Sequence, residues 1–215
     1  MQRNSNNTNS IKELKREREE STLIKLTGRR EVILGFLIML IVIIMPFLNP
    51  YFLSYSNLGV LLLGSVHYAL MAIGICLLLV MGEIDLSIGS NMAMAGIIAA
   101  LGMKNWGLGI PLSIILALLI TTIIGMINGV LVVKVGINFL ITTLATLGIV
   151  RGLVVILAEG GVAFLPEAFN AIGQTKILGL QSPVWFMFVI IFVMGLLLGK
   201  HRFFRQMYYI GGNPK

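Results

Sequence analysis

Six long runs of hydrophobic residues, separated by short polar segments, make up most of this chain. They span Val32–Leu48, Leu58–Met81, Ile88–Met103, Leu108–Val133, Phe139–Leu157 and Pro183–Gly199. Because about 20 apolar residues cross a bilayer as a helix, each run predicts a membrane segment. The third run is shorter and is rich in glycine, alanine and serine. We therefore expect an all-α, polytopic transmembrane bundle of about six segments, with a broken or re-entrant one near residues 82–103.

Composition supports the same conclusion. Hydrophobic residues make up 57% of the 215 residues, charged residues make up 12%, and the mean hydropathy is +0.96. A soluble domain usually carries about a quarter charged residues, and one of this length could not bury so much apolar surface. A soluble enzyme, a disordered protein and a nucleic-acid-binding module are therefore excluded. The single cysteine, Cys76, provides neither a disulfide framework nor a thiolate metal site.

The basic residues lie mainly at the two ends of the chain and predict its orientation. Eight of the 16 Lys and Arg residues fall within the first 30 residues. If the N-terminus is inside and all six runs cross, thirteen basic residues lie on the inner side and two, Lys104 and Lys176, on the outer side. The positive-inside rule then places both ends in the cytoplasm. We expect a cytoplasmic tail over 1–30 with a surface helix at Ile11–Leu26, a transmembrane domain over 31–200, and a cytoplasmic segment over 201–215.

Small residues recur one helical turn apart and predict close helix packing. Three Gly-xxx-Gly pairs are present, and a stripe of Gly and Ala runs along the third segment. The pairs are Gly125/Gly129, Gly148/Gly152 and Gly195/Gly199, and the stripe is Gly89, Ala93, Gly96 and Ala100. In lipid, such faces let helix backbones approach closely. They are typical of a helical bundle and leave its function open.

The richest polar cluster of the hydrophobic region is Gly82-Glu-Ile-Asp-Leu-Ser-Ile-Gly-Ser-Asn91, which holds the only aspartate of the chain, Asp85. Two carboxylates and two hydroxyls before a short helix suit a discontinuous segment. There, Asp85 or Ser87 could cap the freed N–H groups of the next helix. One interpretation is a pivot or pathway element in the bundle interior. The other is a cytoplasmic turn whose acidic groups lie in water.

A few further polar residues lie inside the hydrophobic runs. His67 could relay protons or contact a substrate, although an isolated histidine is more often satisfied by a neighbouring helix. Asn128, together with Thr142, Thr143 and Thr146, could line a polar path or bond to nearby backbone carbonyls. Arg151 lies toward an outer helix end, where its side chain can reach the lipid headgroups.

The chain lacks the motifs of several enzyme and channel classes. The chain contains no Gly-x-Ser-x-Gly nucleophile context, no His-Glu-x-x-His zinc set and no Walker A loop. The paired Asn-Pro-Ala sequences of water channels are missing as well; the nearest approach, Asn49-Pro50-Tyr51, falls between two hydrophobic runs. We therefore expect no enzyme activity, no cofactor and no metal, and any ATP would be hydrolysed by another chain.

Four motifs, in order, resemble the permease subunits of bacterial ABC importers for simple sugars, the ribose-type group. Met81-Gly-Glu-Ile-Asp-Leu-Ser-Ile-Gly-Ser90 resembles the family's G-G/E-I-D-L-S-V-G-S, and Gly125-Met-Ile-Asn-Gly129-Val-Leu-Val resembles G-x-x-N-G-x-L-V. Thr143-Leu-Ala-Thr-Leu147, followed by Arg151-Gly-Leu153, resembles T-L-G/A-T-M/L…A-R-G-L. Phe203 to Asn213 resembles T-x-F-G-R-x-I-Y-A-I-G-G-N.

The resemblance implies a permease that forms the pathway for a simple sugar by alternating access in a bacterial plasma membrane. The implied partners are an ATP-binding subunit, an extracytoplasmic sugar-binding protein and a second permease copy, identical or different. The implied pathway or structural residues are Glu83, Asp85, Ser87, Gly89, Ser90, Asn128, Gly129, Thr143 and Thr146. Those leading toward the ATPase are Arg205, Gly211, Gly212 and Asn213.

The chain also departs from the family pattern. Asn138-Phe139-Leu140 stands where the family has Pro-Pro-Phe, and Phe204 replaces a glycine. The sequence ends near Asn213, where the family's coupling loop opens, so it resembles the N-terminal two-thirds of a permease. We expect this length to insert into a membrane without supporting uptake. The alternatives are a permease for a nucleoside or a branched-chain amino acid, and a truncated membrane subunit that does not transport.

Overall fold

The computed structural model describes residues 30–159, 161–162 and 164–212 of the chain, and nearly all of its regular structure is helical. The predicted tail and its surface helix at Ile11–Leu26 lie outside the described residues. Six apolar helices coincide with the six predicted runs to within a few residues. They are α2 (Arg30–Leu48), α3 (Tyr55–Val80), α4 (Ile88–Lys104), α5 (Ile110–Val133), α6 (Phe139–Ala158) and α8 (Ser182–Lys200). This confirms the predicted all-α bundle class.

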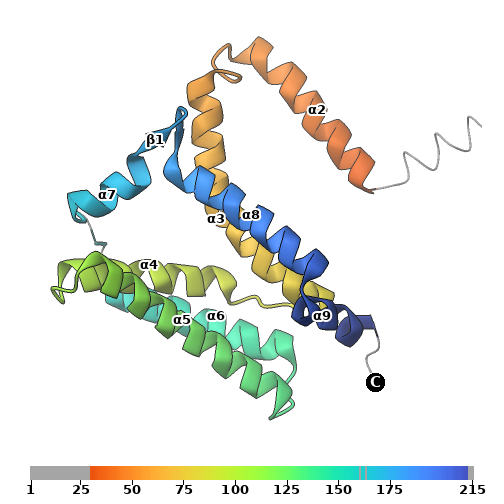
Figure 1. Cartoon of the computed structure of the whole chain (residues 1–215), viewed down its shortest axis with the longest axis vertical. Coiled ribbons are helices and arrows are strands. Elements are labelled where there is room, and N and C mark those ends of the chain that lie inside the picture. Colours follow the sequence, from red (N-terminus) through yellow and green to blue (C-terminus); the bar gives the residue numbers. More distant parts are fainter. Residues whose placement is uncertain (1–29, 160, 163, 213–215) are drawn as a thin grey trace, which may run out of the picture. The chain divides into compact units, whose positions relative to one another are not determined.

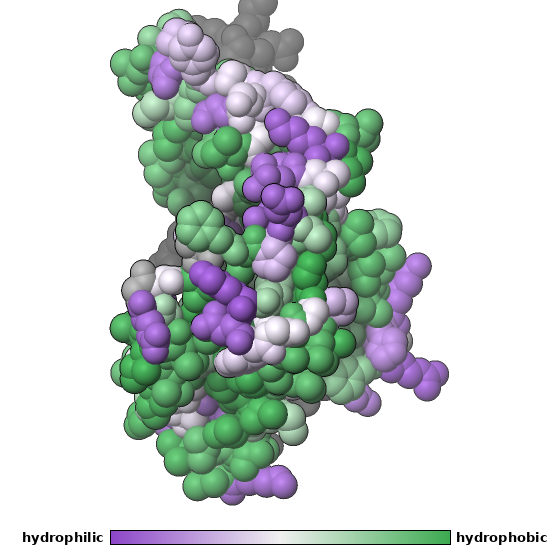
Figure 2. Space-filling view, turned by 90° about the vertical axis from the view of Figure 1, so that its left-hand side faces the viewer, coloured by the Kyte–Doolittle hydropathy of each residue, from purple (hydrophilic) through white to green (hydrophobic). Residues whose placement is uncertain are grey.

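Four of these helices, α3, α5, α6 and α8, are each long and apolar enough to cross a membrane. The apolar part of α2, Val32–Leu48, and the helix α4 are shorter. Most of their large hydrophobic side chains are exposed rather than packed inside the chain. Figure 2 shows one face, on which hydrophobic side chains form most of the surface and hydrophilic ones gather in patches. An exposed surface of this kind is stable in contact with lipid.

The chain falls into two compact units, with the boundary after Leu58. In the first, α2 is followed by a turn whose polar side chains bond to the local backbone. The Tyr51 N–H donates to Asn49 Oδ1 at 3.0 Å, and Asn57 Nδ2 donates to the Phe52 carbonyl at 2.8 Å. Asn49-Pro50-Tyr51 is therefore part of a connecting turn, as expected from its place between two hydrophobic runs.

In the second unit, α4 packs against both α5 and α6 (Figure 1). The core of this helix triplet consists of Met94 and Ile98 from α4, Ala117 from α5 and Val150 from α6. A second cluster joins α3 to α8 through Val66, Val184 and Met187. Each helix thus buries only a narrow stripe against its neighbours.

Between α6 and α8 the chain forms a short helix, α7 (Glu167–Gln174), and a hairpin of β1 (Lys176–Ile177) and β2 (Leu180–Gln181). Lys176 pairs with Gln181 in antiparallel register, and the turn places both Leu178 and Gly179 at positive φ. The hairpin is attached to α8 by the Trp185 indole N–H, which donates to the Ile177 carbonyl at 2.8 Å. The last helix is α9 (Arg202–Gly212).

The glycine faces do not act as predicted within the described residues. A Cβ atom added at any of the six Gly-xxx-Gly glycines, or at Gly89 or Gly96, would meet nothing within 4 Å. The close approach is made instead by Gly102 of α4, where an added Cβ would lie 2.7 Å from Ser113 Oγ of α5. Among the described residues, the predicted glycines therefore make no close contact with another helix.

The departure from Pro-Pro-Phe at the start of α6 has a local replacement. The Asn138 side chain caps the helix, because its Oδ1 atom accepts the Leu140 N–H at 2.9 Å. A capping side chain satisfies one of the free N–H groups of a helix start. This chain therefore stabilises the start of α6 by a hydrogen bond, where the family pattern has prolines.

Candidate functional site

The site begins at the break between α3 and α4. Gly82 has a φ of +83°, a conformation that glycine adopts without steric cost, and it lies two residues after Val80, the last residue of α3. The Glu83 N–H then donates back to the Leu78 carbonyl at 3.0 Å, which closes the end of the helix. The chain leaves α3 in a tight turn and enters α4 at Ile88. The predicted interruption of the helical run is therefore present.

Asp85 organises the start of α4. Its Oδ1 atom accepts two hydrogen bonds from Ser87, one from the backbone N–H at 2.7 Å and one from the hydroxyl at 2.6 Å. Ser87 is the N-cap residue of α4, yet its side chain makes no capping hydrogen bond. Ser90 donates to the Ser87 carbonyl at 2.8 Å. Of the two proposed capping residues, only Asp85 binds a backbone N–H at this turn.

Ser87 connects this turn to two other helices. Its side chain is completely buried, and its Oγ atom accepts a hydrogen bond from Asn128 Nδ2 of α5 at 3.1 Å. Asn128, which is 5% exposed, accepts in turn from Thr146 Oγ1 of α6 at 2.6 Å. We call this series Thr146, Asn128, Ser87, Asp85 the hydrogen-bond chain. It joins three elements that are distant in sequence.

All donors of the hydrogen-bond chain point the same way. Thr146 donates to Asn128, Asn128 donates to Ser87, and Ser87 donates to the Asp85 carboxylate. Hydrogen bonds arranged head to tail polarise one another, and a charged acceptor at the end strengthens the last bond. Because Ser87 and Asn128 are buried, losing one member would leave a neighbour unsatisfied. These hydrogen bonds therefore help to fix the positions of α4, α5 and α6 relative to one another.

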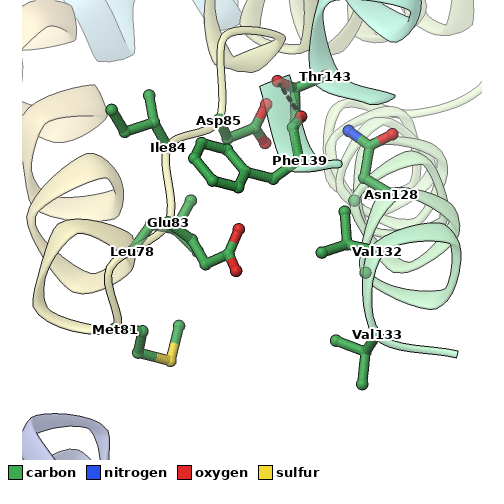
Figure 3. A pocket seen from close by; sticks show the side chains of 12 residues that line it. Leu78, Met81, Glu83, Ile84, Asp85, Asn128, Val132, Val133, Phe139 and Thr143 are labelled. Carbon is green, nitrogen blue, oxygen red and sulfur yellow. Dashed lines mark hydrogen bonds between the residues drawn. The ribbon is translucent and has the colours of Figure 1, made fainter. Parts of the chain in front are cut away.

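A cavity of about 470 Å³ opens beside the hydrogen-bond chain. Figure 3 shows the carboxylates of Glu83 and Asp85 on one side of it and Asn128 and Val132 on the other. It is lined by Leu78, Met81, Glu83, Ile84, Asp85, Gly125, Asn128, Gly129, Val132, Val133, Phe139 and Thr143. Five of the sequence-predicted residues, Glu83, Asp85, Asn128, Gly129 and Thr143, thus line a single space.

The lining determines what the cavity can bind. Most of it is apolar, its charged groups are the two carboxylates, and none of the lining residues is basic. Thr143 donates its hydroxyl proton to the Phe139 carbonyl at 2.8 Å, so its oxygen can only accept from a ligand. The cavity is therefore rich in acceptors and suits a ligand with several donors, such as hydroxyl or ammonium groups.

The remaining predicted residues have different environments. Gly89 is exposed, and Ser90 is buried within the first turn of α4. Arg205, Gly211 and Gly212 belong to α9, where Gly211 lies directly against the Val80 carbonyl at the end of α3. Asn213 lies outside the described residues. Thr142 is buried, and its hydroxyl has no hydrogen-bond partner among them.

Sequence reasoning missed two features of the site. It did not join Ser87 to Asn128, 41 residues away, and it did not identify the apolar walls formed by Met81, Val132 and Phe139. Neither feature has a local signal, because both depend on the rotation of packed helices. The described residues also contain no group of three His, Cys, Asp or Glu side chains that could hold a metal ion.

Comparisons with known proteins give the family context. Residues 57–201 match the family described as branched-chain amino acid transport system / permease component. The chain is 33% identical over 181 residues to the ribose import permease protein RbsC of Haemophilus influenzae, covering 82% of this chain and 56% of the relative. It is 35% identical over 167 residues to the L-arabinose transport system permease protein AraH of Escherichia coli K12, covering 77% of this chain and 51% of the relative.

A third relative is the autoinducer 2 import system permease protein LsrC of Photorhabdus luminescens. It is 34% identical over 145 residues, which cover 67% of this chain and 44% of the relative. No solved structure matches. The chain thus spans about half the length of the curated relatives it matches.

Proposed function

We propose a transport function for this chain, which belongs to the family of branched-chain amino acid transport system permease components. We propose that it is the membrane-spanning subunit of an ATP-driven importer and forms part of the pathway for a simple sugar. The observation that carries the sugar assignment is the acceptor-rich cavity of Glu83 and Asp85, in a chain whose relatives include ribose and arabinose permeases. Carboxylates accept hydrogen bonds from sugar hydroxyls and can release them again.

The hydrogen-bond chain gives this pathway a defined structure. It connects the turn that carries Glu83 and Asp85 to α5 and α6, so a shift of either helix would move the cavity wall. In alternating access, such a shift would follow from contacts that differ between two states of the importer. The pathway residues of the proposal are Glu83, Asp85, Ser87, Gly89, Ser90, Asn128, Gly129, Thr143 and Thr146.

The partners follow from the same proposal. An ATP-binding subunit supplies hydrolysis, an extracytoplasmic binding protein delivers the sugar, and a second permease copy completes the pathway. Arg205 and Gly211 of α9 would lead toward the ATP-binding subunit, with the chain's N-terminus in the cytoplasm of a bacterial cell. The chain itself then contributes no catalytic residue.

A branched-chain amino acid is the second candidate substrate, because the family description names that class. The two carboxylates could accept hydrogen bonds from its ammonium group, although no basic residue lines the cavity to bind its carboxylate. This missing counter-charge favours a neutral polyol. An uptake assay with both substrate classes separates the two candidates.

The test is radiolabelled uptake in a bacterial strain that lacks its own sugar permeases. The chain, extended through a coupling loop and the final helices of its family, is produced with the ATP-binding subunit and binding protein of its importer. We expect ATP-dependent uptake of ribose or arabinose, and a several-fold loss with Asn128→Leu because the hydrogen-bond chain is interrupted. The matched control is Ile123→Leu, an exposed apolar position on the same helix. Uptake of leucine alone, or no uptake at normal membrane abundance, would refute the sugar assignment.

A further inference from the structure

A second cavity, of about 450 Å³, lies between α3, α4 and α5 and shares no lining residue with the first. Its walls are His67, Leu70 and Met71 from α3; Ile88, Asn91, Met92 and Ala95 from α4; and Thr121 from α5. His67 is the thirteenth of the 26 residues of α3, and Thr121 the twelfth of the 24 residues of α5. The cavity therefore lies near the middle of two candidate membrane spans.

The polar groups of this cavity are incompletely satisfied. The His67 imidazole is exposed and makes no hydrogen bond to the described residues; its ring contact is with Tyr68, at a centroid distance of 4.4 Å. Asn91 Nδ2 donates to the Thr121 carbonyl at 3.1 Å. The Asn91 Oδ1 atom is buried and has no partner in the described part of the chain. The sequence favours a histidine satisfied by a neighbouring helix, and none of the described helices supplies that hydrogen bond.

An imidazole without a partner halfway along a membrane helix is costly in lipid, because its hydrogen bonds to water are lost and not replaced. The cost disappears if the cavity holds water or a polar solute. The other walls, including Leu70, Met71 and Met92, are apolar. A few polar groups among apolar walls, in a volume between about 300 and 1,000 Å³, are typical of small-molecule sites.

We propose that this cavity is a sugar-binding subsite midway along the pathway. A sugar presents an apolar C–H face and a rim of hydroxyls. A neutral imidazole can both donate to one hydroxyl and accept from another. His67 would bind the hydroxyl rim, while Leu70, Met71 and Met92 contact the C–H face. This inference rests on the proposed transport function, and it places a second binding position away from the Glu83–Asp85 cavity.

The test uses a reporter cysteine that leaves His67 in place. In a Cys76→Ala background, Ala95→Cys places a thiol on the cavity wall, and a charged methanethiosulfonate reagent is applied to permeabilised cells. We expect modification of this thiol to be slowed several-fold by saturating ribose or arabinose. Adding His67→Leu should abolish the protection while modification continues. The matched control is Gly96→Cys, the next residue of α4, which does not line the cavity and has open space around it.

The outcomes separate the subsite from the transport function. No modification at Ala95→Cys, no effect of sugar on its rate, equal protection at Gly96→Cys, or protection that persists with His67→Leu would each overturn the subsite. Sugar uptake by the Cys76→Ala parent is measured in parallel. Normal uptake without protection refutes the subsite alone, and protection without uptake refutes the transport function alone.

Discussion

At the scale of single residues, the candidate site is governed by the way buried polar groups are paired. Ser87 is completely buried and Asn128 nearly so, and each takes part in the hydrogen-bond chain that ends on Asp85. Buried polar groups in apolar surroundings are tolerated when their hydrogen bonds are made, and they become costly when one partner is removed. We therefore expect this turn to depend on the acceptor oxygen of Asp85, which receives both hydrogen bonds from Ser87.

We expect Asp85→Asn to be tolerated much better than Asp85→Leu. Asparagine keeps an oxygen at the position that accepts from the Ser87 N–H and hydroxyl, whereas leucine leaves both donors without an acceptor. The leucine variant should lose about 1–3 kcal/mol of stability, as expected for unsatisfied buried groups. Thermal unfolding of the purified protein in detergent, with membrane abundance measured alongside, checks this. Equal melting temperatures for wild type and both variants would show that the turn does not depend on the Asp85 oxygen.

At the scale of elements, the helices meet through apolar side chains and one close contact. The core of α4, α5 and α6 is formed by Met94, Ile98, Ala117 and Val150. Near the C-terminal end of α4, Gly102 lies against Ser113 of α5, and this contact leaves no space for a larger residue. The Gly-xxx-Gly faces do not meet another helix among the described residues. Gly125 and Gly129 line the first cavity instead, where the lack of side chains keeps it open.

Gly102→Ala should destabilise the contact between α4 and α5. The new methyl group would lie 2.7 Å from Ser113 Oγ, 2.9 Å from Ser113 Cβ and 3.3 Å from Ser113 Cα. Because the Cβ atom cannot turn away by a change of rotamer, the backbone of α4 or α5 has to move. Overpacking of this kind costs about 1–3 kcal/mol. The measurement is again the thermal unfolding midpoint, and Ser113→Gly should restore part of the loss.

Gly96→Ala is the matched control on the same helix. A Cβ atom at Gly96 would meet nothing within 4 Å, and alanine favours a helix over glycine by about 1 kcal/mol. This variant should be as stable as the wild type or more so. A Gly102→Ala variant as stable as Gly96→Ala would show that α4 and α5 are not in contact at Gly102.

At the scale of the whole molecule, exposed apolar side chains and the placing of the basic residues both fit a chain that lies in a bilayer. Its large apolar side chains are mostly exposed, including Leu112, Leu118 and Ile127 of α5. Its basic residues lie mainly beyond the ends of the hydrophobic runs, thirteen on one predicted side and two on the other. Lipid surrounds the exposed apolar side chains without cost, and the positive-inside rule predicts the orientation from the distribution of basic residues.

The orientation can be tested with two exposed positions on opposite predicted sides. In a Cys76→Ala background, Gln174→Cys on α7 should react with a membrane-impermeant maleimide in intact cells. Val135→Cys, between α5 and α6, should react only after permeabilisation. The physical reason is that Lys134 and the basic N-terminal residues are retained on the cytoplasmic side. Labelling of Val135→Cys but not Gln174→Cys in intact cells would invert the orientation.

The membrane class, the number of hydrophobic segments and most of their boundaries could be predicted from the sequence. The run Ile88–Met103, for example, became the helix Ile88–Lys104, and the interruption at Gly82 was visible in the polar cluster that follows. These features could be predicted because they are local. Bilayer thickness sets the length of an apolar run, and glycine followed by several polar residues favours a turn over a continuous helix.

Which polar groups meet could be learned only from the packed helices. The tertiary structure joined Ser87 to Asn128 and Thr146, left His67 without a partner among the described residues, and moved the close helix contact from the predicted glycine pairs to Gly102. Each outcome depends on how far neighbouring helices are rotated and shifted against one another. These rotations are set by the packing of all the apolar side chains together, and no short stretch of sequence encodes them.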